Sequence, residues 1–259
     1  MADYLTEFFG LSGKVAVLTG AGGHLVGEMS RGLARAGVRV AVLDKSLQAA
    51  EAVVDSIRSE GGTAMAGEID VTLREDFVAA KKAVLAEFGT IDYAVFGANL
   101  NAPTPFMEVD VKEWNDILAV QLTGTMLGLQ EFGDHMVEQG RGSIVTISSA
   151  SAGPPLSKAY AYSVAKAGVK NITQNVAREW ATKGVRVNAL RPGFLPTEWS
   201  QIHFIDEDRE KAILGHTAMK RYGEPRELVG AVLWLLSDAA SFVTGAEIAV
   251  DGGFSAMTI

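Results

Sequence analysis

The sequence predicts a single α/β domain over residues 1–259, with a doubly wound parallel sheet that carries helices on both faces. Short β-branched runs alternate with longer stretches whose apolar residues recur every three or four positions, the pattern of strand and helix in succession. The strand runs are almost continuously apolar, as expected of a sheet buried on both sides. Neither a linker rich in Pro, Gly or Ser nor an internal repeat divides the chain.

Seven runs are predicted as strands, at residues 15–19, 38–43, 64–69, 93–96, 143–148, 185–190 and 247–250. Strands that alternate with helices pair in parallel, which gives a Rossmann-type, seven-stranded sheet. Prolines lie just beyond the predicted strand ends, at Pro103, Pro105, Pro154, Pro155, Pro192 and Pro196. Because ligands of such sheets bind outside the carboxyl ends of the strands, we expect the functional site there.

The composition excludes several classes of function. The chain is 48% hydrophobic with a net charge of -8 and no dense Lys/Arg run, which argues against a nucleic-acid partner. No apolar run reaches the roughly 20 residues of a membrane helix, so no membrane partner is expected. Residues 1–10 include Asp3 and Glu7 and do not resemble a signal peptide. With no cysteine and no ligand-spaced His/Asp/Glu group, no metal site is expected, and a cytoplasmic location is the default.

A glycine-rich turn follows the first predicted strand and opens a helical pattern that extends to Arg35. Glycines at such a turn let the backbone approach a pyrophosphate, which the free N–H groups of the helix N-terminus bind. The alternative is that the turn is merely structural and binds no cofactor. For His24, the alternative to a place beside the pyrophosphate is an ordinary position in a surface loop. The residues expected to contact a dinucleotide here are Gly20, Gly22, Gly23, His24 and Leu25.

Asp44 ends the second predicted strand, roughly 20 residues past the glycine turn. A carboxylate at that place accepts hydrogen bonds from both adenosine ribose hydroxyls and repels the extra phosphate of NADP. The structural alternative is an N-cap for the helix from Ser46. The combination favours NAD over NADP as the cofactor, although Lys45 leaves some room for NADP.

Tyr162 and Lys166 lie in a helical stretch after the strand predicted at 143–148, and their spacing of four places them on one helix face. An ammonium near a phenol lowers the phenol pKa from about 10. Tyr162 is therefore predicted to act as an acid/base near neutral pH. Tyr160 is expected to point to a different face.

These residues fit a larger set of motifs. Ser149 stands 13 residues before Tyr162, Asp70-Val71 follows the third predicted strand, a Pro-Gly segment occupies residues 191–197, and Asp251-Gly252-Gly253 follows the last strand. With these motifs the chain resembles the short-chain dehydrogenase/reductase superfamily from Gly13 to the carboxyl terminus.

The resemblance implies roles for specific residues. Tyr162 would take the proton of a substrate alcohol while hydride passes to the nicotinamide, Lys166 would bind the nicotinamide ribose, and Ser149 would hydrogen-bond the reacting oxygen. Gln121 stands at the position of the catalytic proton-relay asparagine, seven residues after Trp114. Further cofactor contacts are implied for Asp70, Val71, Ala98, Asn99, Pro192, Gly193, Leu195 and Thr197.

Within the superfamily, the chain is similar to the fructuronate/mannonate oxidoreductase and gluconate dehydrogenase-like group. The similarity lies in the Gly22-Gly23 pair, Asn101, residues 155–158 and the ending at 250–256. It implies oxidation of a secondary alcohol, or of a hemiacetal to a lactone, on a sugar, sugar acid or similar polar substrate. Residues 198–220 correspond to the substrate lid. The candidate substrate-binding residues are Asn101, Ser151, Lys158, Arg191 and His203.

Several positions depart from the superfamily pattern. His24 and Val26 occupy the positions of the second and third glycines, and valine should crowd helix against strand unless Gly27 makes room. Residues 96–99 replace the usual Asn-Asn-Ala-Gly. Gln121 is one methylene longer than the relay asparagine, so we expect activity with a rearranged proton path.

Two other functions and an assembly follow from the same resemblance. A 3-oxoacyl or small-ketone reductase is the enzymatic alternative, which Asp44 disfavours because biosynthetic reductases tend to use NADP. A catalytically silent NAD-sensing regulator is the alternative from another class, suggested by the altered glycines and Gln121.

Relatives of this kind imply a homotetramer joined through helices at about 111–138 and 158–182, where Gly124 and Gly128 would permit close helix approach.

Overall fold

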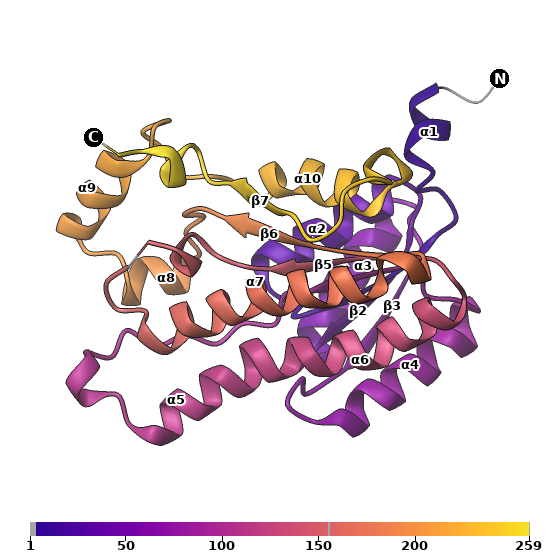
Figure 1. Cartoon of the computed structure of the whole chain (residues 1–259), viewed down its shortest axis with the longest axis horizontal. Coiled ribbons are helices and arrows are strands. Elements are labelled where there is room, and N and C mark those ends of the chain that lie inside the picture. The colour runs from indigo at the N-terminus through magenta and orange to yellow at the C-terminus, as the bar shows by residue number, and fades with distance from the viewer. Residues whose placement is uncertain (1–3, 155, 259) are drawn as a thin grey trace.

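One sheet of seven parallel strands organises the molecule, in the order β3-β2-β1-β4-β5-β6-β7 (Figure 1), which confirms the predicted fold class. The computed structural model describes residues 4–154 and 156–258, so Pro155 of the predicted 155–158 motif lies outside the described residues. The strands are β1 (Val15–Thr19), β2 (Arg39–Asp44), β3 (Ala64–Glu68), β4 (Tyr93–Phe96), β5 (Gly142–Ile147), β6 (Val185–Pro192) and β7 (Glu247–Val250). The strand order reverses between β1 and β4, which is where a doubly wound sheet opens its ligand crevice.

Four strands differ by one or two residues from their predicted bounds. The largest difference is in β6, which continues to Pro192 because Arg191 and Pro192 pair with Ala249 and Val250 of β7. Proline has no N–H to give to a ladder, so it is tolerated in a sheet only at special positions. Here it is the last strand residue, and the next amide, of Gly193, donates to the Val250 carbonyl at 3.0 Å.

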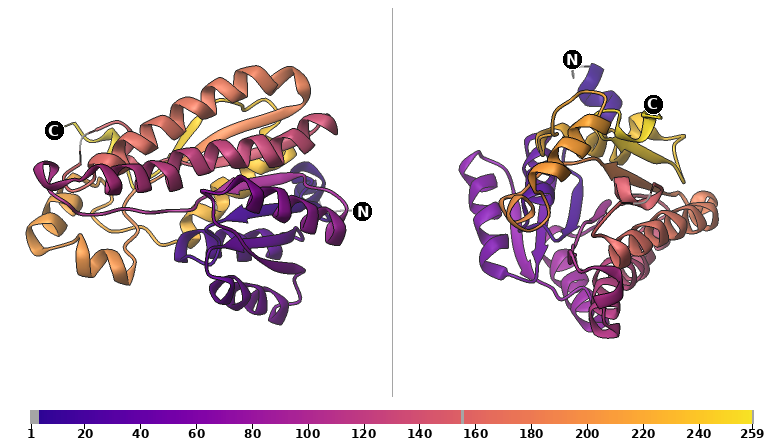
Figure 2. Two further views of the ribbon diagram at one scale, coloured as in Figure 1. Left: turned by 90° about the horizontal axis from the view of Figure 1, so that it is seen from below. Right: turned by 90° about the vertical axis from the view of Figure 1, so that its left-hand side faces the viewer.

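Helices cover both faces of the sheet (Figure 2). The first face carries α2 (His24–Arg35), α3 (Leu47–Ser59) and α10 (Arg226–Leu236), and the second carries α4 (Arg74–Phe88), α6 (Gly124–Glu138) and α7 (Tyr160–Trp180). Alternate strand residues feed the two cores: Ala16 and Leu18 of β1 pack into the first, whereas Val15 and Val17 pack into the second. This two-sided burial explains why the strand segments are apolar at nearly every position.

The Val26 side chain packs against Gly97, which follows the end of β4. It is 5% exposed on α2, and a Cβ atom added to Gly97 would lie 2.5 Å from its Cγ2. Gly27 is also closely packed, since a Cβ there would lie 3.2 Å from the Ala21 carbonyl oxygen, but the space that the Val26 methyl occupies is at Gly97. The two departures from the superfamily pattern, at 26 and at 97, compensate each other.

Gly97→Ala should destabilise the protein by about 1–3 kcal/mol, the usual cost of overpacking a core. In a Val26→Ala background, the same substitution should cost much less, because the overlapping methyl group is gone. Denaturant unfolding of the two single variants and the double variant measures this coupling. An equal cost of Gly97→Ala in both backgrounds would show that Val26 is not what requires a glycine.

The segment from 111 to 138 is almost continuously helical. It consists of α5 (Val111–Leu118), a π-helical turn at Ala119–Thr123 and α6. Its glycines pack inside the chain: a Cβ on Gly124 would lie 2.9 Å from the Val71 carbonyl oxygen, and one on Gly128 would lie 2.5 Å from the Phe96 ring. These glycines therefore make room for neighbours in the same chain, and their part in a subunit interface stays a prediction.

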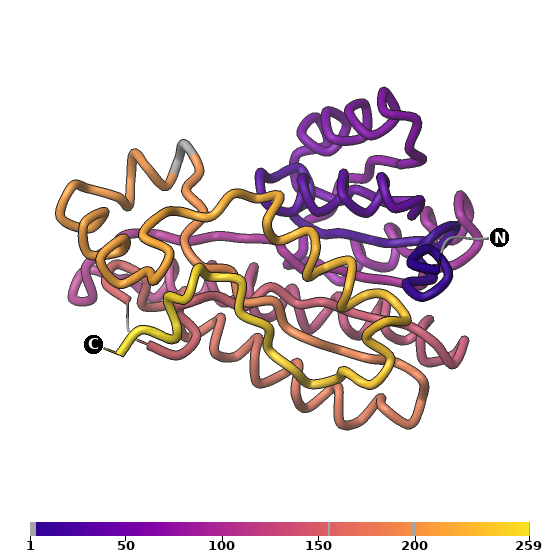
Figure 3. The backbone as a smooth tube through the Cα atoms, turned by 90° about the horizontal axis from the view of Figure 1, so that it is seen from above, coloured from indigo at the N-terminus to yellow at the C-terminus, as the bar shows by residue number. Residues whose placement is uncertain are grey.

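Two short helices form the predicted lid. They are α8 (Glu198–His203) and α9 (Glu207–His216), and they project beyond the carboxyl ends of the strands (Figures 1 and 3). The remaining helical elements are α1 (Tyr4–Phe9) and the 3₁₀ turns Phe106–Glu108, Ala150–Ala152, Ala181–Lys183, Asp238–Ala240 and Phe254–Ala256. Residues of the lid and of the 3₁₀ turn after β5 line the same cavity.

Candidate active site

A cavity of about 470 Å³ opens at the carboxyl ends of the strands, below the lid. Its walls combine residues from the ends of β1, β2, β4, β5 and β6 with residues of α7 and of the lid. The predicted site residues that line it are Gly20, Gly23, His24, Leu25, Asp44, Asn99, Asn101, Ser149, Ser151, Tyr162, Lys166, Pro192, Gly193, Leu195 and Thr197. Sequence motifs that are far apart in the chain thus meet in one place.

The glycine turn packs closely against the end of β4 and leads into the N-terminus of α2. Gly20 has a φ of +68°, and a Cβ there would lie 2.6 Å from the Cα of Ala98, so only glycine fits. Gly23 precedes the first residue of α2, His24, whose side chain is exposed at the cavity wall. The free N–H groups at this helix N-terminus suit a pyrophosphate.

The Asp44 carboxylate faces the glycine turn. Its Oδ2 accepts from the Gly22 N–H at 3.0 Å and its Oδ1 accepts from the Ser46 N–H at 2.9 Å. Ser46 itself caps α3, accepting from the Ala49 N–H, so the N-cap interpretation of Asp44 is wrong. Asp44 is free to face a ligand because another residue caps the helix.

The neighbouring lysine is turned to another partner. The Lys45 ammonium pairs with the Asp70 carboxylate at 2.6 Å. The hydrogen bond from Lys45, together with those from Thr72, lowers the pKa of Asp70 to about 2. Among the described residues, Asp70, Val71, Ala98 and Gly22 do not line the cavity, so their contacts with a cofactor stay predictions.

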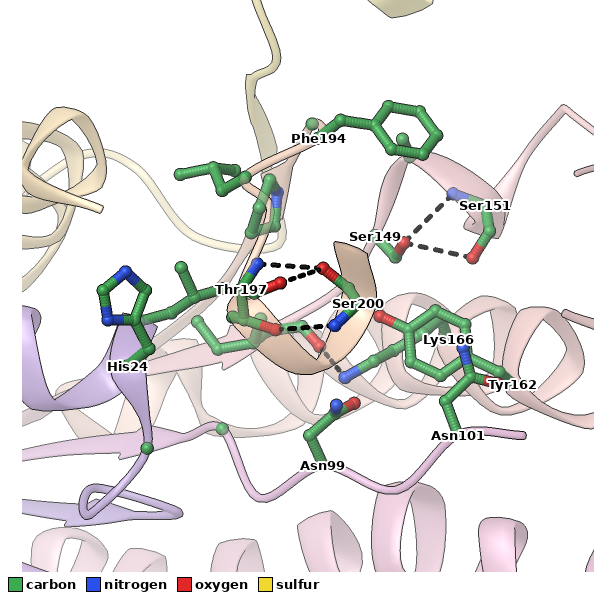
Figure 4. Close-up of a pocket in the computed structure, with 18 of the residues that line it drawn as sticks. His24, Asn99, Asn101, Ser149, Ser151, Tyr162, Lys166, Phe194, Thr197 and Ser200 are labelled. Carbon is green, nitrogen blue, oxygen red and sulfur yellow. Dashed lines mark hydrogen bonds between the residues drawn. The ribbon is translucent and has the colours of Figure 1, made fainter. Parts of the chain in front are cut away.

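Ser149, Tyr162 and Lys166 direct their polar ends to the same part of the cavity (Figure 4). The Ser149 hydroxyl accepts two hydrogen bonds from Ser151, one from its backbone N–H at 3.1 Å and one from its hydroxyl at 3.0 Å. The Lys166 ammonium donates to the Ile147 carbonyl at 2.7 Å and lies 5.5 Å from the centroid of the Tyr162 ring. The predicted pair therefore shares one helix face and one cavity, whereas Tyr160 packs on Phe106 with ring centroids 5.2 Å apart.

Burial dominates the electrostatics of this pair. It raises the pKa of Tyr162, against the smaller lowering effect of the hydrogen bond with Ser149. The expected lowering of the Tyr162 pKa by Lys166 is therefore wrong for the protein alone. Burial also lowers the pKa of Lys166, which is 3% exposed, to about 7. Burial thus favours the neutral phenol of Tyr162 and the neutral amine of Lys166.

Lys166→Met should remove a pH dependence of stability. In the unfolded chain Lys166 keeps a proton up to a pKa of 10.5, whereas in the folded chain it loses it above about 7. The free energy of unfolding should therefore rise between these pH values, by about 1 kcal/mol per pH unit from this group. Unfolding at pH 7 to 10 measures the slope, with the exposed Lys82→Met as control. Equal slopes in wild type and Lys166→Met would contradict the burial of an ionisable group.

Gln121 holds the loop after β4. It is 1% exposed, in the π-helical turn, and its Nε2 donates to the Asn99 Oδ1 at 2.7 Å and to the Leu100 carbonyl at 2.8 Å. Its Oε1 is buried without a hydrogen-bond partner among the described residues. Asn99 in turn points toward Lys166 (Figure 4). Gln121 thus positions Asn99, and its relay function stays a prediction.

Three predicted substrate residues lie elsewhere. Lys158 pairs with Asp206 at 3.1 Å, and Arg191 is bonded to Glu247, so both cations already have carboxylate partners. His203 is on the exposed side of α8. Among the described residues, none of the three lines the cavity.

The lid supplies lining residues that the sequence prediction did not single out: Ser200, Phe204, Ile205 and Arg209. Arg209 is four residues before the buried Ile213 of α9, so the two share a helix face. The sequence does contain this spacing, but the orientation of a short lid helix over the cavity is not readable from it.

Comparison with known proteins agrees with this geometry. A family model described as enoyl-(acyl carrier protein) reductase, one of the short-chain dehydrogenase/reductase models, matches residues 27–255. The chain belongs to the short-chain dehydrogenase/reductase family. The resemblance found in the sequence is thereby confirmed, and as a member of this family the protein is an oxidoreductase that acts on CH–OH groups and binds a nicotinamide cofactor.

Relatives within the family cover almost the whole chain. The uncharacterized oxidoreductase UxuB of Bacillus subtilis (strain 168) is 38% identical, covering 95% of this chain and 96% of its own length. A protein assigned as a D-mannonate oxidoreductase from Haemophilus influenza, with bound NAD, has a TM-score of 0.91 at 33% identity, covering 99% of each chain. A gluconate 5-dehydrogenase from Burkholderia cenocepacia J2315, in complex with NADP and tartrate, has a TM-score of 0.94 at 29% identity, covering 98% of this chain and all of that one.

The described part of the chain has neither a membrane-spanning helix nor a cluster of metal-binding side chains. In residues 4–154 and 156–258, no helix has the length and hydropathy to cross a membrane. In the same residues, no group of three or more His, Asp or Glu side chains is arranged to hold a metal ion.

Proposed function

We propose that the protein is an NAD-dependent dehydrogenase that interconverts a secondary alcohol and a ketone on a sugar acid, with Tyr162 as the acid/base. The observation that carries this proposal is that Ser149, Tyr162 and Lys166 open onto the same cavity as Asp44 and the glycine turn. A nicotinamide placed near Tyr162 would leave its adenosine end near Asp44. The residues present therefore fit a dinucleotide.

NAD is favoured over NADP by the environment of Asp44. This carboxylate faces the cavity and would repel a phosphate on the adenosine ribose. Lys45, the nearest candidate to offset that repulsion, is engaged with Asp70. The similar D-mannonate oxidoreductase binds NAD and the similar gluconate 5-dehydrogenase binds NADP, so the comparisons alone do not choose between them.

The chain's own residues account for the proton transfer. Ser149 donates a hydrogen bond to the reacting oxygen and holds it beside the Tyr162 hydroxyl. In the oxidative direction Tyr162 accepts the proton of the alcohol, and in the reductive direction it donates a proton to the new alkoxide oxygen. NAD, when bound, supplies the acceptor for the hydride that leaves the carbinol carbon. Lys166, held by the Ile147 carbonyl, places a positive charge close to the developing phenolate.

A sugar-acid substrate is supported by the relatives and by the cavity wall. Gluconate and mannonate appear in the names of the two similar solved proteins. Asn101, Ser151 and Ser200 line the same cavity and offer hydrogen bonds to a polyhydroxylated chain.

We also propose a homotetramer in the cytoplasm. Val111 of α5 and Val164 of α7 are 75% and 49% exposed, so apolar side chains stand on the outer faces of both long helices. Light scattering tests this assembly, which should have four times the monomer mass of 27.4 kDa.

Cofactor-linked turnover tests the proposed function. Aldonates, uronates, neutral polyols and, in reverse, 3-oxoacyl thioesters are offered with NAD(H) and with NADP(H). We expect NADH formation from at least one sugar acid, well above that from the other classes. Turnover of 3-oxoacyl thioesters alone would replace this function by the acyl reductase, and cofactor binding without any turnover would indicate a sensor.

A further inference from the structure

One guanidinium group reaches the cavity from the lid. In the described part of the chain, the lysine and arginine side chains that line the cavity are Lys166 and Arg209. Lys166 is engaged with the Ile147 carbonyl and belongs to the proton-transfer group. Arg209 comes from α9 of the lid, and the proposed mechanism does not use it.

Arg209 is held in place but is not neutralised. Its Nη1 donates to the Ser157 hydroxyl at 2.5 Å, and its backbone N–H donates to the Asp206 carboxylate at 2.8 Å. Its Nε is buried and has no hydrogen-bond partner among the described residues. The one carboxylate close to it, Asp206, is paired with Lys158 at 3.1 Å. Arg209 thus lines the cavity with a guanidinium whose side-chain hydrogen bond goes to a neutral hydroxyl, and among the described residues it forms no ion pair, so it suits an anionic ligand.

The rest of the cavity restricts which anion fits. Asp44 is the only carboxylate among the described lining residues, and it accepts a hydrogen bond from the glycine turn. Asp206, the lid carboxylate that attracts Arg209, does not line the cavity. Asn101, Ser151 and Ser200 also line the cavity with hydroxyl and amide groups. A guanidinium edge and a carboxylate match as two parallel hydrogen bonds.

We infer that Arg209 binds the carboxylate of the substrate, so that the lid selects sugar acids over neutral polyols. This inference rests on the proposed function, because it assigns the substrate's charged end within the same site. A neutral polyol leaves the Arg209 guanidinium without an anionic partner, whereas a carboxylate supplies one. Lys158 and Arg191, the cations expected for this purpose, already have carboxylate partners and instead fix the lid and the end of β6.

The test compares each acid with the polyol that has a hydroxymethyl group in place of the carboxylate. Gluconate and mannonate are paired with glucitol and mannitol, and kcat/KM with NAD is measured for wild type, Arg209→Gln and Arg209→Lys. We expect Arg209→Gln to lower kcat/KM for the acids about a hundredfold and to change it less than about threefold for the polyols. For the acids, kcat/KM of Arg209→Lys should lie between the values of wild type and Arg209→Gln, since an ammonium keeps the charge but cannot form two parallel hydrogen bonds. Arg221→Gln is the matched control, because Arg221 pairs with Glu227 outside this cavity.

Binding is measured beside turnover, so that the inference and the proposed function fail separately. Calorimetric titration of gluconate and mannonate into the NADH-loaded protein should give a weaker affinity for Arg209→Gln than for wild type. Equal affinities, or an equal loss of kcat/KM for acid and polyol, would overturn the role of Arg209. Affinity that depends on Arg209 without any turnover would support the carboxylate site and overturn the proposed reaction.

Discussion

Tyr162→Phe should lower kcat by about 10²- to 10⁴-fold, which is the usual contribution of a positioned acid/base. The phenol oxygen is the group that receives or supplies the proton, and among the described lining residues only Asp44, at the glycine turn, has another titratable oxygen. The affinity for NAD should change little, because the ring remains in place. Steady-state NADH formation and a calorimetric titration with NAD measure the two quantities separately.

Tyr160→Phe is the matched control. Tyr160 is two residues away on the same helix, is 40% exposed and packs on Phe106 outside the cavity. Its loss of a hydroxyl should leave kcat within about threefold of wild type. Similar losses in both variants would mean that Tyr162 contributes to folding or to lid packing and not to proton transfer.

Asp44→Ser should change the cofactor preference. The ratio of kcat/KM for NAD to that for NADP should fall by about a hundredfold or more, because juxtaposed like charges cost several kcal/mol. Serine keeps a hydrogen-bond acceptor for the Gly22 N–H and for a ribose hydroxyl, so the turn itself should persist. Activity with both cofactors at saturating sugar acid measures the ratio.

Glu68→Ser controls for the loss of negative charge at this edge of the sheet. Glu68 ends β3 and pairs in register with Asp44, but it is exposed and lies outside the cavity. Its substitution should leave the cofactor ratio unchanged. A ratio that responds equally to both substitutions would assign the preference to long-range charge and not to the position of Asp44.

The sheet was predictable because its strands are buried on both faces. That burial requires nearly continuous apolar runs, and β1 and β4, which are buried at every residue, begin and end where those runs do. Tyr162 and Ser149 were predictable for a different reason: a motif spaced within one strand-turn-helix unit keeps its geometry locally. Even the departure at Val26 was visible in the sequence, but its compensating partner was not, because Gly97 lies on another strand end.

The substrate end could not be predicted in the same way. Lys158 and Arg191 are near the catalytic residues in sequence, yet their partners Asp206 and Glu247 come from distant segments. A cation's availability depends on such long-range pairing, which no local pattern reports. Arg209 reaches the cavity only because α9 folds back over it, and this placement is a property of the tertiary structure. The pKa of Tyr162 was misjudged for a related reason, since burial raises it and outweighs the lowering effect of the hydrogen bond with Ser149.

Deuterium transfer tests the central claim most directly. A sugar acid that gives NADH is prepared with deuterium on the carbinol carbon, and the nicotinamide product is examined by mass spectrometry and NMR. The account predicts one deuterium on each NADH formed by wild type, and a rate of transfer reduced at least about a hundredfold in Tyr162→Phe. NAD that binds tightly while no deuterium moves in either direction, for any sugar acid tested, would contradict the account and indicate a nucleotide sensor.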